Sequence, residues 1–296
     1  MAGLLSRDAA LGDTGRPTFG QDDAAHPASD GTRQDGPRMS APRLSALIVA
    51  RNEAARLPDC LASVAFADEV VVVLDRTTDA SAAIVQAAGG RVLEGAWELE
   101  GGRRNAGIAA CTGDWILEVD ADERVSPPLA AAVRRMIGTS THAWHQVPVD
   151  NYVGDRLVRY GWAGSFGTTS VPRLFRRGAK SWRAQRVHPG LDWVGKEGPK
   201  ITEGALIHLV DRDISDMLRR LDKYSSAKAA DLIASGKIGS LPDNLRRFVS
   251  RFVKSYISRK GYREGGWGIL LAFCTGLFPL LAYLKARLEP ERHGGR

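Results

Sequence analysis

The sequence is poor in cysteine, with Cys60, Cys111 and Cys274 as its only thiols in 296 residues. An odd number of widely separated cysteines provides neither a disulfide framework nor the paired spacing of a zinc site, so we expect a reducing compartment. The N-terminus lacks a basic start followed by a long apolar run, and a secretory signal is not expected. No Gly-x-Gly-x-x-Gly sequence follows the first apolar run, which argues against a dinucleotide-dependent dehydrogenase.

The composition allows a substantial core and carries an excess of positive charge. Hydrophobic residues make up 44% of the chain, and the formal net charge is +7. A basic protein suits anionic partners, which include nucleic acids, phosphorylated substrates and acidic membrane surfaces. The usual nucleic-acid-binding motifs are absent, so we expect no nucleic-acid partner.

Three regions follow one another along the chain. Residues 1–42 are rich in Gly, Asp, Pro, Ser and Thr, which predicts a disordered leader. Residues 43–210 are predicted to form an α/β domain and residues 211–296 a helical, membrane-associating region. Expected strands at 44–50, 69–74, 91–93 and 115–119 alternate with helices at 53–66, 80–88 and 103–111. This alternation predicts a parallel sheet covered on both faces, followed after residue 143 by mixed or antiparallel strands. Further helices are expected at 214–235, 244–259 and 267–288.

Two acidic residues, Asp120 and Asp122, follow the apolar segment at residues 115–119. The carboxyl ends of parallel strands face the ligand crevice of such a sheet. Mg²⁺ and Mn²⁺ prefer carboxylate oxygens and share their coordination with substrate phosphates. The pair therefore predicts a divalent-metal site, although Asp-x-Asp sequences also occur in solvated surface turns.

Other polar residues stand near the ends of the expected strands and helices. Asn52 follows the first strand, where it could contact a ligand or cap the next helix. Asp75 ends the second strand, where its carboxylate could accept hydrogen bonds from a ribose or base, or form a turn. Arg103 and Arg104 lie near a helix start, where they could hold a diphosphate or belong to an exposed basic turn. His208 could add an imidazole ligand to a metal, or be an ordinary hydrogen-bonded histidine.

Several segments together resemble family 2 glycosyltransferases, most closely the β-glucosyltransferases of the lipopolysaccharide core. They include Ala-Arg-Asn-Glu at 50–53, Arg-Asn-Ala-Gly at 104–107 and Asp-Ala-Asp-Glu at 120–123. Looser matches occur at 173–177, at 187–188 and at Lys-Tyr-Ser in 223–225. The resemblance covers nearly all of the chain apart from the leader.

The resemblance implies a GT-A fold, in which a Rossmann-like mixed sheet is flanked by helices. It also implies inverting transfer from a nucleoside-diphosphate sugar, expected to be a UDP-sugar, to a lipopolysaccharide-core or other cell-envelope glycan, with Mg²⁺ or Mn²⁺ as cofactor. At the matching positions, the residues that would bind the nucleotide sugar are Ala50, Asn52, Glu53, Asp75, Arg104 and Asp120. Asp122 would bind the metal, with Asp120 as a second ligand.

The catalytic base is not marked clearly by the sequence. Family members usually carry His-Glu where this chain has His188-Pro189, and a proline cannot exchange a proton. The role would then pass to Asp192, to Glu197 or to His188 itself. Asp192 is preferred, because a carboxylate in the loop-rich region after the metal motif suits a base that meets the acceptor.

The stretch at residues 267–284 contains no charged residue and follows a basic belt between Arg246 and Arg263. Such a segment is barely long enough to span a bilayer, and Gly276 and Pro279 are expected to interrupt it. Basic belts are attracted to anionic lipid. We therefore expect shallow attachment to the cytoplasmic face of a bacterial inner membrane, close to a lipid-linked acceptor. A buried core helix or an oligomer contact is the alternative.

Two other functions fit part of this pattern. A nucleotidyltransferase also needs paired acids and a metal, but it usually has a glycine-rich phosphate loop near the first strand, which is absent here. A non-catalytic protein that keeps the GT-A fold is the second alternative, because Pro189 replaces the usual glutamate.

Overall fold

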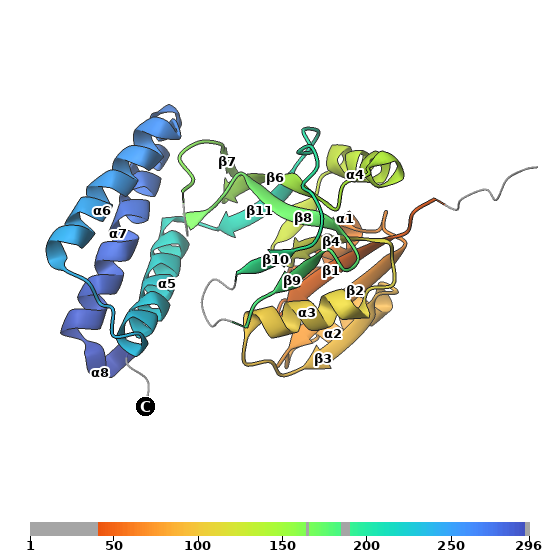
Figure 1. Ribbon diagram of the computed structural model, residues 1–296, viewed down its shortest axis with the longest axis horizontal. Helices are drawn as coiled ribbons and strands as arrows, with labels where there is room; N and C mark the ends of the chain where they lie inside the picture. Colours follow the sequence, from red (N-terminus) through yellow and green to blue (C-terminus); the bar gives the residue numbers. More distant parts are fainter. Residues whose placement is uncertain (1–40, 164–165, 185–189, 294–296) are drawn as a thin grey trace, which may run out of the picture. The chain divides into compact units, whose positions relative to one another are not determined.

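The computed structural model describes residues 41–163, 166–184 and 190–293 (Figure 1). Residues 41–296 group as one unit by their contacts. The predicted leader, apart from its last two residues, lies outside the described residues. The boundary near residue 210 stays a prediction.

The first half of the sheet is parallel, as the sequence predicts. Its strands are β1 (Leu44–Ala50), β2 (Glu69–Asp75), β3 (Arg91–Gly95) and β4 (Trp115–Asp120), in the order β3-β2-β1-β4. Their continuous apolar runs are buried because helices cover both faces. Ala50 pairs with Leu74 and Val49 with Asp120, so the carboxyl ends of three strands lie at one edge of the sheet.

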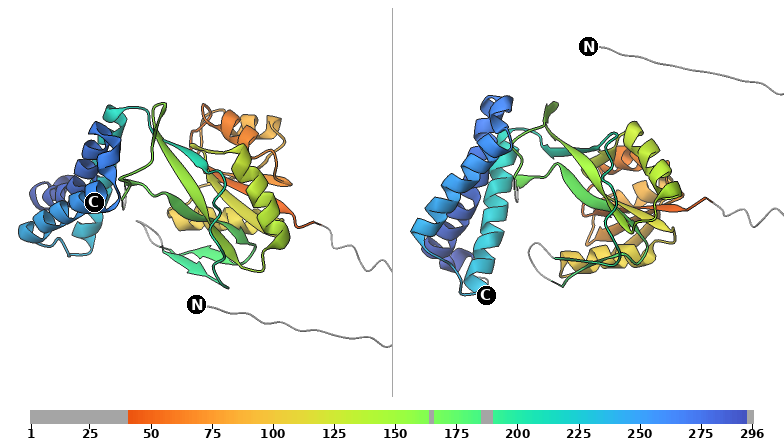
Figure 2. Two further views of the ribbon diagram at one scale, coloured as in Figure 1. Left: turned by 90° about the horizontal axis from the view of Figure 1, so that it is seen from above. Right: turned by 45° about the horizontal axis from the view of Figure 1, so that its top comes forward.

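Helices of the α/β region divide between the two faces of the sheet (Figure 2). The helices are α1 (Leu57–Ser63), α2 (Ser81–Ala87), α3 (Glu100–Ala110) and α4 (Pro127–Thr139). One core cluster packs α1, α2 and α4 against residues such as Ile48 and Val72. A second cluster packs α3 against Leu47 and Val71, which alternate with the first set along the strands. Helix α1 begins later than predicted, because Pro58 fits only the first helical turn.

The second half of the sheet is mixed. Its strands are β5 (Glu123–Val125), β6 (Trp144–Val153), β7 (Arg156–Val158), β8 (Ser170–Arg176) and β11 (Leu206–Asp211). The order continues from β4 as β8-β6-β11-β5, with β7 paired to β6. Strands β9 (Lys180–Trp182) and β10 (Leu191–Trp193) form a separate antiparallel pair. Pairing of β11 with β5 sets His208 opposite Glu123, one residue from Asp122.

The chain ends in helices, as predicted. They are α5 (Ile214–Ala234), α6 (Leu241–Val253) and α7 (Gly266–Leu288), followed by the short α8 (Pro290–His293). A short π-helix, η2 (Lys254–Ser258), and a 3₁₀-helix, η3 (Gly261–Glu264), join α6 to α7. A third core cluster packs α5 and α7 against Val153, Val158 and Trp162, so the helices are attached to the end of β6 and β7.

The expected interruption of the last long helix is wrong. Helix α7 runs unbroken through Gly276 and Pro279, and both residues are buried. Gly276 lies where a Cβ atom would be 2.8 Å from the carbonyl oxygen of Phe248, so α6 and α7 approach closely there. The helix is long and apolar enough to cross a membrane, yet 56% of its most apolar window is buried inside the protein. Packing between α5 and α6 therefore accounts for much of its apolar character (Figure 1).

Gly268→Ala is expected to destabilise the fold, whereas Gly266→Ala is not. A Cβ atom at position 268 would lie 1.7 Å from the carbonyl oxygen of Gly261, and one at position 266 would meet nothing within 4 Å. Overpacking of this kind costs about 1–3 kcal/mol. Urea unfolding of the two variants measures the difference, and equal stability would show that η3 and α7 are not packed as described.

Candidate active site

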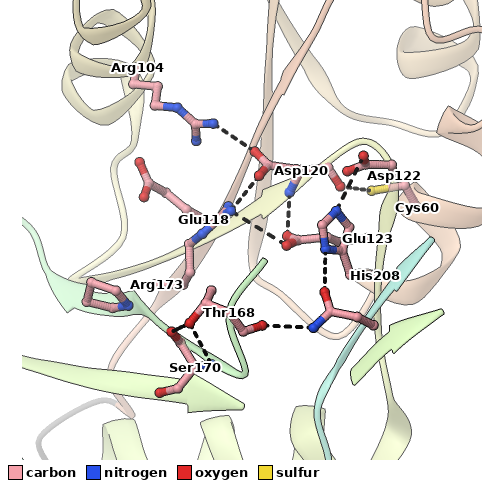
Figure 3. Close-up of polar contacts among 12 residues, drawn as sticks. Cys60, Arg104, Glu118, Asp120, Asp122, Glu123, Thr168, Ser170, Arg173 and His208 are labelled. Carbon is pink, nitrogen blue, oxygen red and sulfur yellow. Dashed lines mark hydrogen bonds and ion pairs between the residues drawn. The ribbon is translucent and has the colours of Figure 1, made fainter. Parts of the chain in front are cut away.

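The turn between β4 and β5 carries the predicted acid pair (Figure 3). The backbone N–H of Asp120 donates to Oε2 of Glu123 at 2.8 Å, which closes the turn. The carbonyl oxygen of Asp122 accepts from the backbone N–H of Leu209 at 3.1 Å, which fixes β11 beside it. The side chains of Asp120 and Asp122 are thereby held on a rigid turn at the carboxyl edge of the sheet.

Two arginines occupy the oxygens of Asp120. Nη2 of Arg104 lies 3.0 Å from Oδ1, and Nη2 of Arg173 donates to Oδ2. Burial alone would raise the pKa of Asp120, but the two guanidinium charges hold it far below its usual range. Arg104 is itself oriented by Glu100, whose Oε1 accepts from its Nε at 3.1 Å. Asp120 is thus an ionised carboxylate, 27% exposed, whose partners in this structure are arginines.

Glu123 shares Arg173 with Asp120. Nη2 of Arg173 lies 3.5 Å from Oε1 of Glu123, and both side chains are almost fully buried. Burial raises the pKa of Glu123 to about 6, and the charge of Arg173 opposes that rise. Arg173 is therefore shared by two neighbouring carboxyl groups beneath the turn, of which Asp120 also has Arg104 as a partner.

Asp122 faces His208 and, in contrast to Asp120, has no arginine partner among the described residues. Its Oδ2 lies 3.6 Å from Nε2 of His208. On the other side of the ring, Nδ1 is 3.0 Å from Oδ1 of Asn151, whose Nδ2 donates to the carbonyl oxygen of Thr168 at 2.8 Å. Because the amide group of Asn151 is oriented by Thr168, Nδ1 is the donor, and the lone pair of Nε2 in a neutral ring points toward Asp122.

Asp122 and His208 therefore provide two of the ligands that a divalent metal needs. Burial alone would lower the pKa of His208, but the negative charge of the neighbouring Asp122 raises it. The described residues include no group of three or more His, Cys, Asp or Glu side chains placed to hold a metal. Mg²⁺ and Mn²⁺ sites of nucleotide-using enzymes commonly combine one or two protein carboxylates with substrate phosphates and water, so two ligands fit such an ion.

A cavity of about 670 Å³ opens above this turn, at the carboxyl edge of β1 and β4. Six predicted site residues line it: Ala50, Glu53, Arg104, Asp120, Asp122 and His208. Six further polar residues also line it: Arg51, Arg56, Glu100, Arg103, Lys223 and Tyr224. The lining therefore has five Arg or Lys side chains and four carboxylates, a mixture that suits an anionic ligand bound together with a cation.

Two of the predicted nucleotide-binding residues serve neighbouring loops in this structure. Asn52 has a φ of 56°, and its Oδ1 accepts from the backbone N–H of Thr78 at 2.8 Å. It does not cap α1, whose N-cap is Arg56, so the capping alternative is wrong. Asp75 is buried, and its carboxylate accepts from Arg76 at 3.1 and 3.0 Å and from the N–H of Trp97 at 3.1 Å.

Comparison with known proteins finds relatives of this chain that match over most of its length. The sequence profile described as Glycosyl transferase family 2 matches residues 45–188. A lipopolysaccharide core biosynthesis glycosyltransferase, LpsC of Rhizobium meliloti, is 30% identical over 84% of this chain and 92% of its own length. The chain belongs to glycosyltransferase family 2. An uncharacterized glycosyltransferase of Rickettsia bellii is 39% identical over 81% of this chain and 85% of its own length.

Among solved structures, the likeness is partial. Glucosyl-3-phosphoglycerate synthase from Mycobacterium tuberculosis, in complex with Mn²⁺, UDP and glucosyl-3-phosphoglycerate, aligns at 20% identity with a TM-score of 0.31. The alignment covers 38% of this chain and 44% of that chain. The assignment to the family therefore depends on the profile and on the relatives that match over most of their length, and it favours glycosyl transfer over nucleotidyl transfer.

None of the three candidates for the catalytic base of this glycosyltransferase is placed at the turn between β4 and β5. Two lie on other parts of the fold, and the third lies outside the described residues. Glu197 forms a bridge with Trp144, which lies at the opposite end of the sheet from Asp120, so it is not part of the cavity. Asp192 lies on β10, where its Oδ1 accepts from Nε of Arg183 at 2.8 Å. That hydrogen bond holds the pKa of Asp192 below its usual value. His188 lies outside the described residues.

A buried ion pair that was not predicted from the sequence packs beside Arg104 of the glycosyltransferase site. Lys180 and Glu118 are paired, with 1% of each side chain exposed. The indole N–H of Trp182 donates to Oε1 of Glu118 at 3.2 Å, and Arg104 lies over the ring of Trp182 at 5.0 Å. Burial lowers the pKa of Lys180 to about 8. The pair fixes β9 beneath Arg104, and thus helps to position the arginine.

Arg173→Met is expected to lower stability by about 3–5 kcal/mol, because it leaves Asp120 and Glu123 without their shared cation. Arg177→Met is the matched control, since Arg177 is exposed on the turn after β8. Urea unfolding at neutral pH measures both variants. Equal stability of the two would mean that Arg173 does not balance the buried carboxylates.

Proposed function

We propose that this family 2 glycosyltransferase transfers a sugar from a UDP-sugar to an acidic cell-envelope glycan, with inversion and with the help of Mg²⁺ or Mn²⁺. The observation that supports the proposal is the Asp122–His208 pair, which has no arginine partner among the described residues. It lies beside the arginine-lined cavity at the carboxyl edge of the sheet. The relative LpsC, whose name assigns it to lipopolysaccharide core biosynthesis, supports the choice of acceptor class.

Asp122 and His208 would hold the metal, with oxygens of the donor diphosphate and water as the other ligands. A bound divalent ion supplies Lewis-acid stabilisation of the leaving nucleoside diphosphate. Asn151 keeps the imidazole in the tautomer that this requires. Asp120, which the sequence analysis offered as a second ligand, serves instead to hold two arginines in place.

Arg103 and Arg104 would face the diphosphate. Both lie in the first two turns of α3 and line the cavity, and Arg104 is fixed from two sides by Glu100 and Asp120. A guanidinium that is already oriented loses little entropy when it binds a phosphate group. Ala50 and Glu53 would contact the nucleoside, while Asn52 and Asp75 stiffen the two loops beside it.

The acceptor would approach from the side of α5. A second cavity of about 550 Å³ shares Arg56, Lys223 and Tyr224 with the donor cavity. Its other charged residues are Arg212, Arg219 and Arg220, balanced by Asp211 and Asp216. Five basic groups face two carboxylates there, which suits an acceptor with negative charge. Lys223 has no ion-pair partner among the described residues and lies where the two cavities meet.

Inversion requires that the acceptor hydroxyl attack opposite the diphosphate while a side chain takes its proton. Asp192 stays our candidate for that base. Its carboxylate is exposed on the β9–β10 pair, and Arg183 would have to release it before it could accept a proton. We place the reaction at the cytoplasmic face of the inner membrane, where nucleotide sugars are made and a lipid-linked acceptor would be met.

Asp122→Asn is expected to abolish most of the gain in UDP affinity that Mn²⁺ provides, about tenfold or more, because an amide is a poor ligand for a hard cation. Asp155→Asn is the control, since Asp155 is an exposed acid on the turn after β6. Calorimetric titration of UDP with Mn²⁺ or with EDTA measures the gain. Nucleoside-diphosphate release from UDP-, GDP- and ADP-sugars then identifies the donor. An unchanged gain in Asp122→Asn rules out the assigned metal site.

Arg219→Gln is expected to raise the KM for an acidic acceptor about fivefold, the effect of losing about 1 kcal/mol of exposed charge interaction. UDP affinity should stay unchanged, because Arg219 lines the second cavity and not the first. Lys228→Gln, on the same helix but outside both cavities, is the control. If Arg219→Gln weakens the binding of UDP as much as the binding of the acceptor, then the donor and the acceptor do not occupy the two cavities separately.

A further inference from the structure

Exposed apolar side chains are concentrated in the C-terminal helices. Among the described residues, every large hydrophobic side chain that is exposed lies between Ile214 and Leu288, except Val194 and Leu209. The longest series runs along α6 and η2: Leu241, Leu245, Val249, Val253 and Ile257. Each is between 43% and 58% exposed. Because they recur every fourth residue, they form one stripe on the helix surface.

The side of α6 that packs on the protein is not this stripe. The residues of α6 and η2 that are buried are Asn244 and Ser255, both polar. Phe248 lies against α7, with its ring 5.6 Å from that of Phe273. Phe273 and Ile269 of α7 are themselves 48% and 50% exposed, so the apolar surface continues from α6 onto α7. A surface helix of a soluble domain usually turns its apolar stripe inward, and α6 does the opposite.

Basic residues lie beside the stripe, and several of them have no acidic partner among the residues that the structure describes. Residues 241–260 contain six Arg or Lys side chains and one acid, Asp243, whose carboxylate accepts from the hydroxyl of Ser240, the N-cap residue of α6, at 2.7 Å. Arg246, Arg247 and Lys254 are exposed and form no ion pair within the described part of the chain. The arginines in and just before α5 differ, because Arg212, Arg219 and Arg220 are each paired with an aspartate.

We propose that the stripe on α6 and η2, together with Ile269 and Phe273, is a contact surface for an anionic lipid bilayer. Helix α6 would lie in the interface with its apolar side chains among the acyl chains and its unpaired cations at the headgroups. This proposal rests on the proposed function in one respect, that the acceptor is linked to a membrane. Helix α7, buried between α5 and α6 over most of its length, supports the surface and does not cross the bilayer.

A second copy of the chain fits this surface less well. A symmetric contact through the same patch would bring the unpaired arginines of two subunits together, which is unfavourable without acidic partners. An anionic bilayer neutralises these charges and accepts the apolar stripe at the same time. Charge complementarity therefore selects lipid over self-association.

Co-sedimentation of the full chain with vesicles tests the proposal without donor or acceptor, so its outcome is independent of the glycosyl transfer. The protein should bind vesicles that contain phosphatidylglycerol and bind pure phosphatidylcholine much less. The combined variant Leu245→Ser, Val249→Ser, Val253→Ser should lose about tenfold or more in partitioning. Arg246→Gln, Arg247→Gln, Lys254→Gln should lose the preference for anionic lipid. Val194→Ser, an exposed valine outside the surface, is the matched control and should bind as the unaltered chain does.

Circular dichroism and UDP affinity verify that the variants are folded. Tryptophan fluorescence of Val249→Trp gives a second measurement, with a blue shift expected when anionic vesicles are added. Two results overturn the proposal: unchanged vesicle binding by the serine variant, which would point to insertion of α7, or a dimer that becomes monomeric in that variant, which would make the patch a subunit contact.

Discussion

Asp120 is a partly buried carboxylate that stays ionised because Arg104 and Arg173 each bind one of its oxygens. The arrangement connects three separate parts of the chain, since Arg104 comes from α3, Asp120 from the end of β4 and Arg173 from β8. Arg173 also balances Glu123, which closes the turn through the amide of Asp120. As a result, the neighbouring Asp122 lines the cavity without an arginine partner in the described part of the chain, and its carboxylate is available to a cation.

The parallel half of the sheet could be predicted from the sequence, because its signals are local. Continuous apolar runs identified β1, β2 and β4, and the acid pair at the end of β4 placed Asp120 and Asp122 at the correct edge. The mixed half could not be predicted in the same way. The pairing of β11 with β5 brings His208 to Asp122, and no periodicity within either strand encodes that partner. Arg173 was visible as part of a motif, but its role depends on β8 lying beside β4.

The helical region shows a similar limit of sequence reasoning. Hydropathy singled out α7, because its residues are apolar around the whole helix. Only the packing reveals which of these residues other helices cover, and most of α7 is covered. Helix α6 is less apolar than α7, yet α6 and η2 together have the larger exposed apolar stripe. The residues of α6 and η2 that are buried against the protein are polar, Asn244 and Ser255. Hydropathy along a single segment measures composition, whereas membrane contact depends on the surface left exposed.

The central claim is that Asp122 and His208, rather than Asp120, form the protein side of a metal site for the donor diphosphate. A crystal structure with UDP and Mn²⁺ tests it most directly, because Mn²⁺ can be located by its anomalous signal. The account predicts a single peak between Asp122 and His208, with the diphosphate beside Arg103 and Arg104 and with Arg173 still bound to Asp120. A peak coordinated by Asp120 after Arg173 has moved away, or UDP bound without any metal at Asp122, would contradict it.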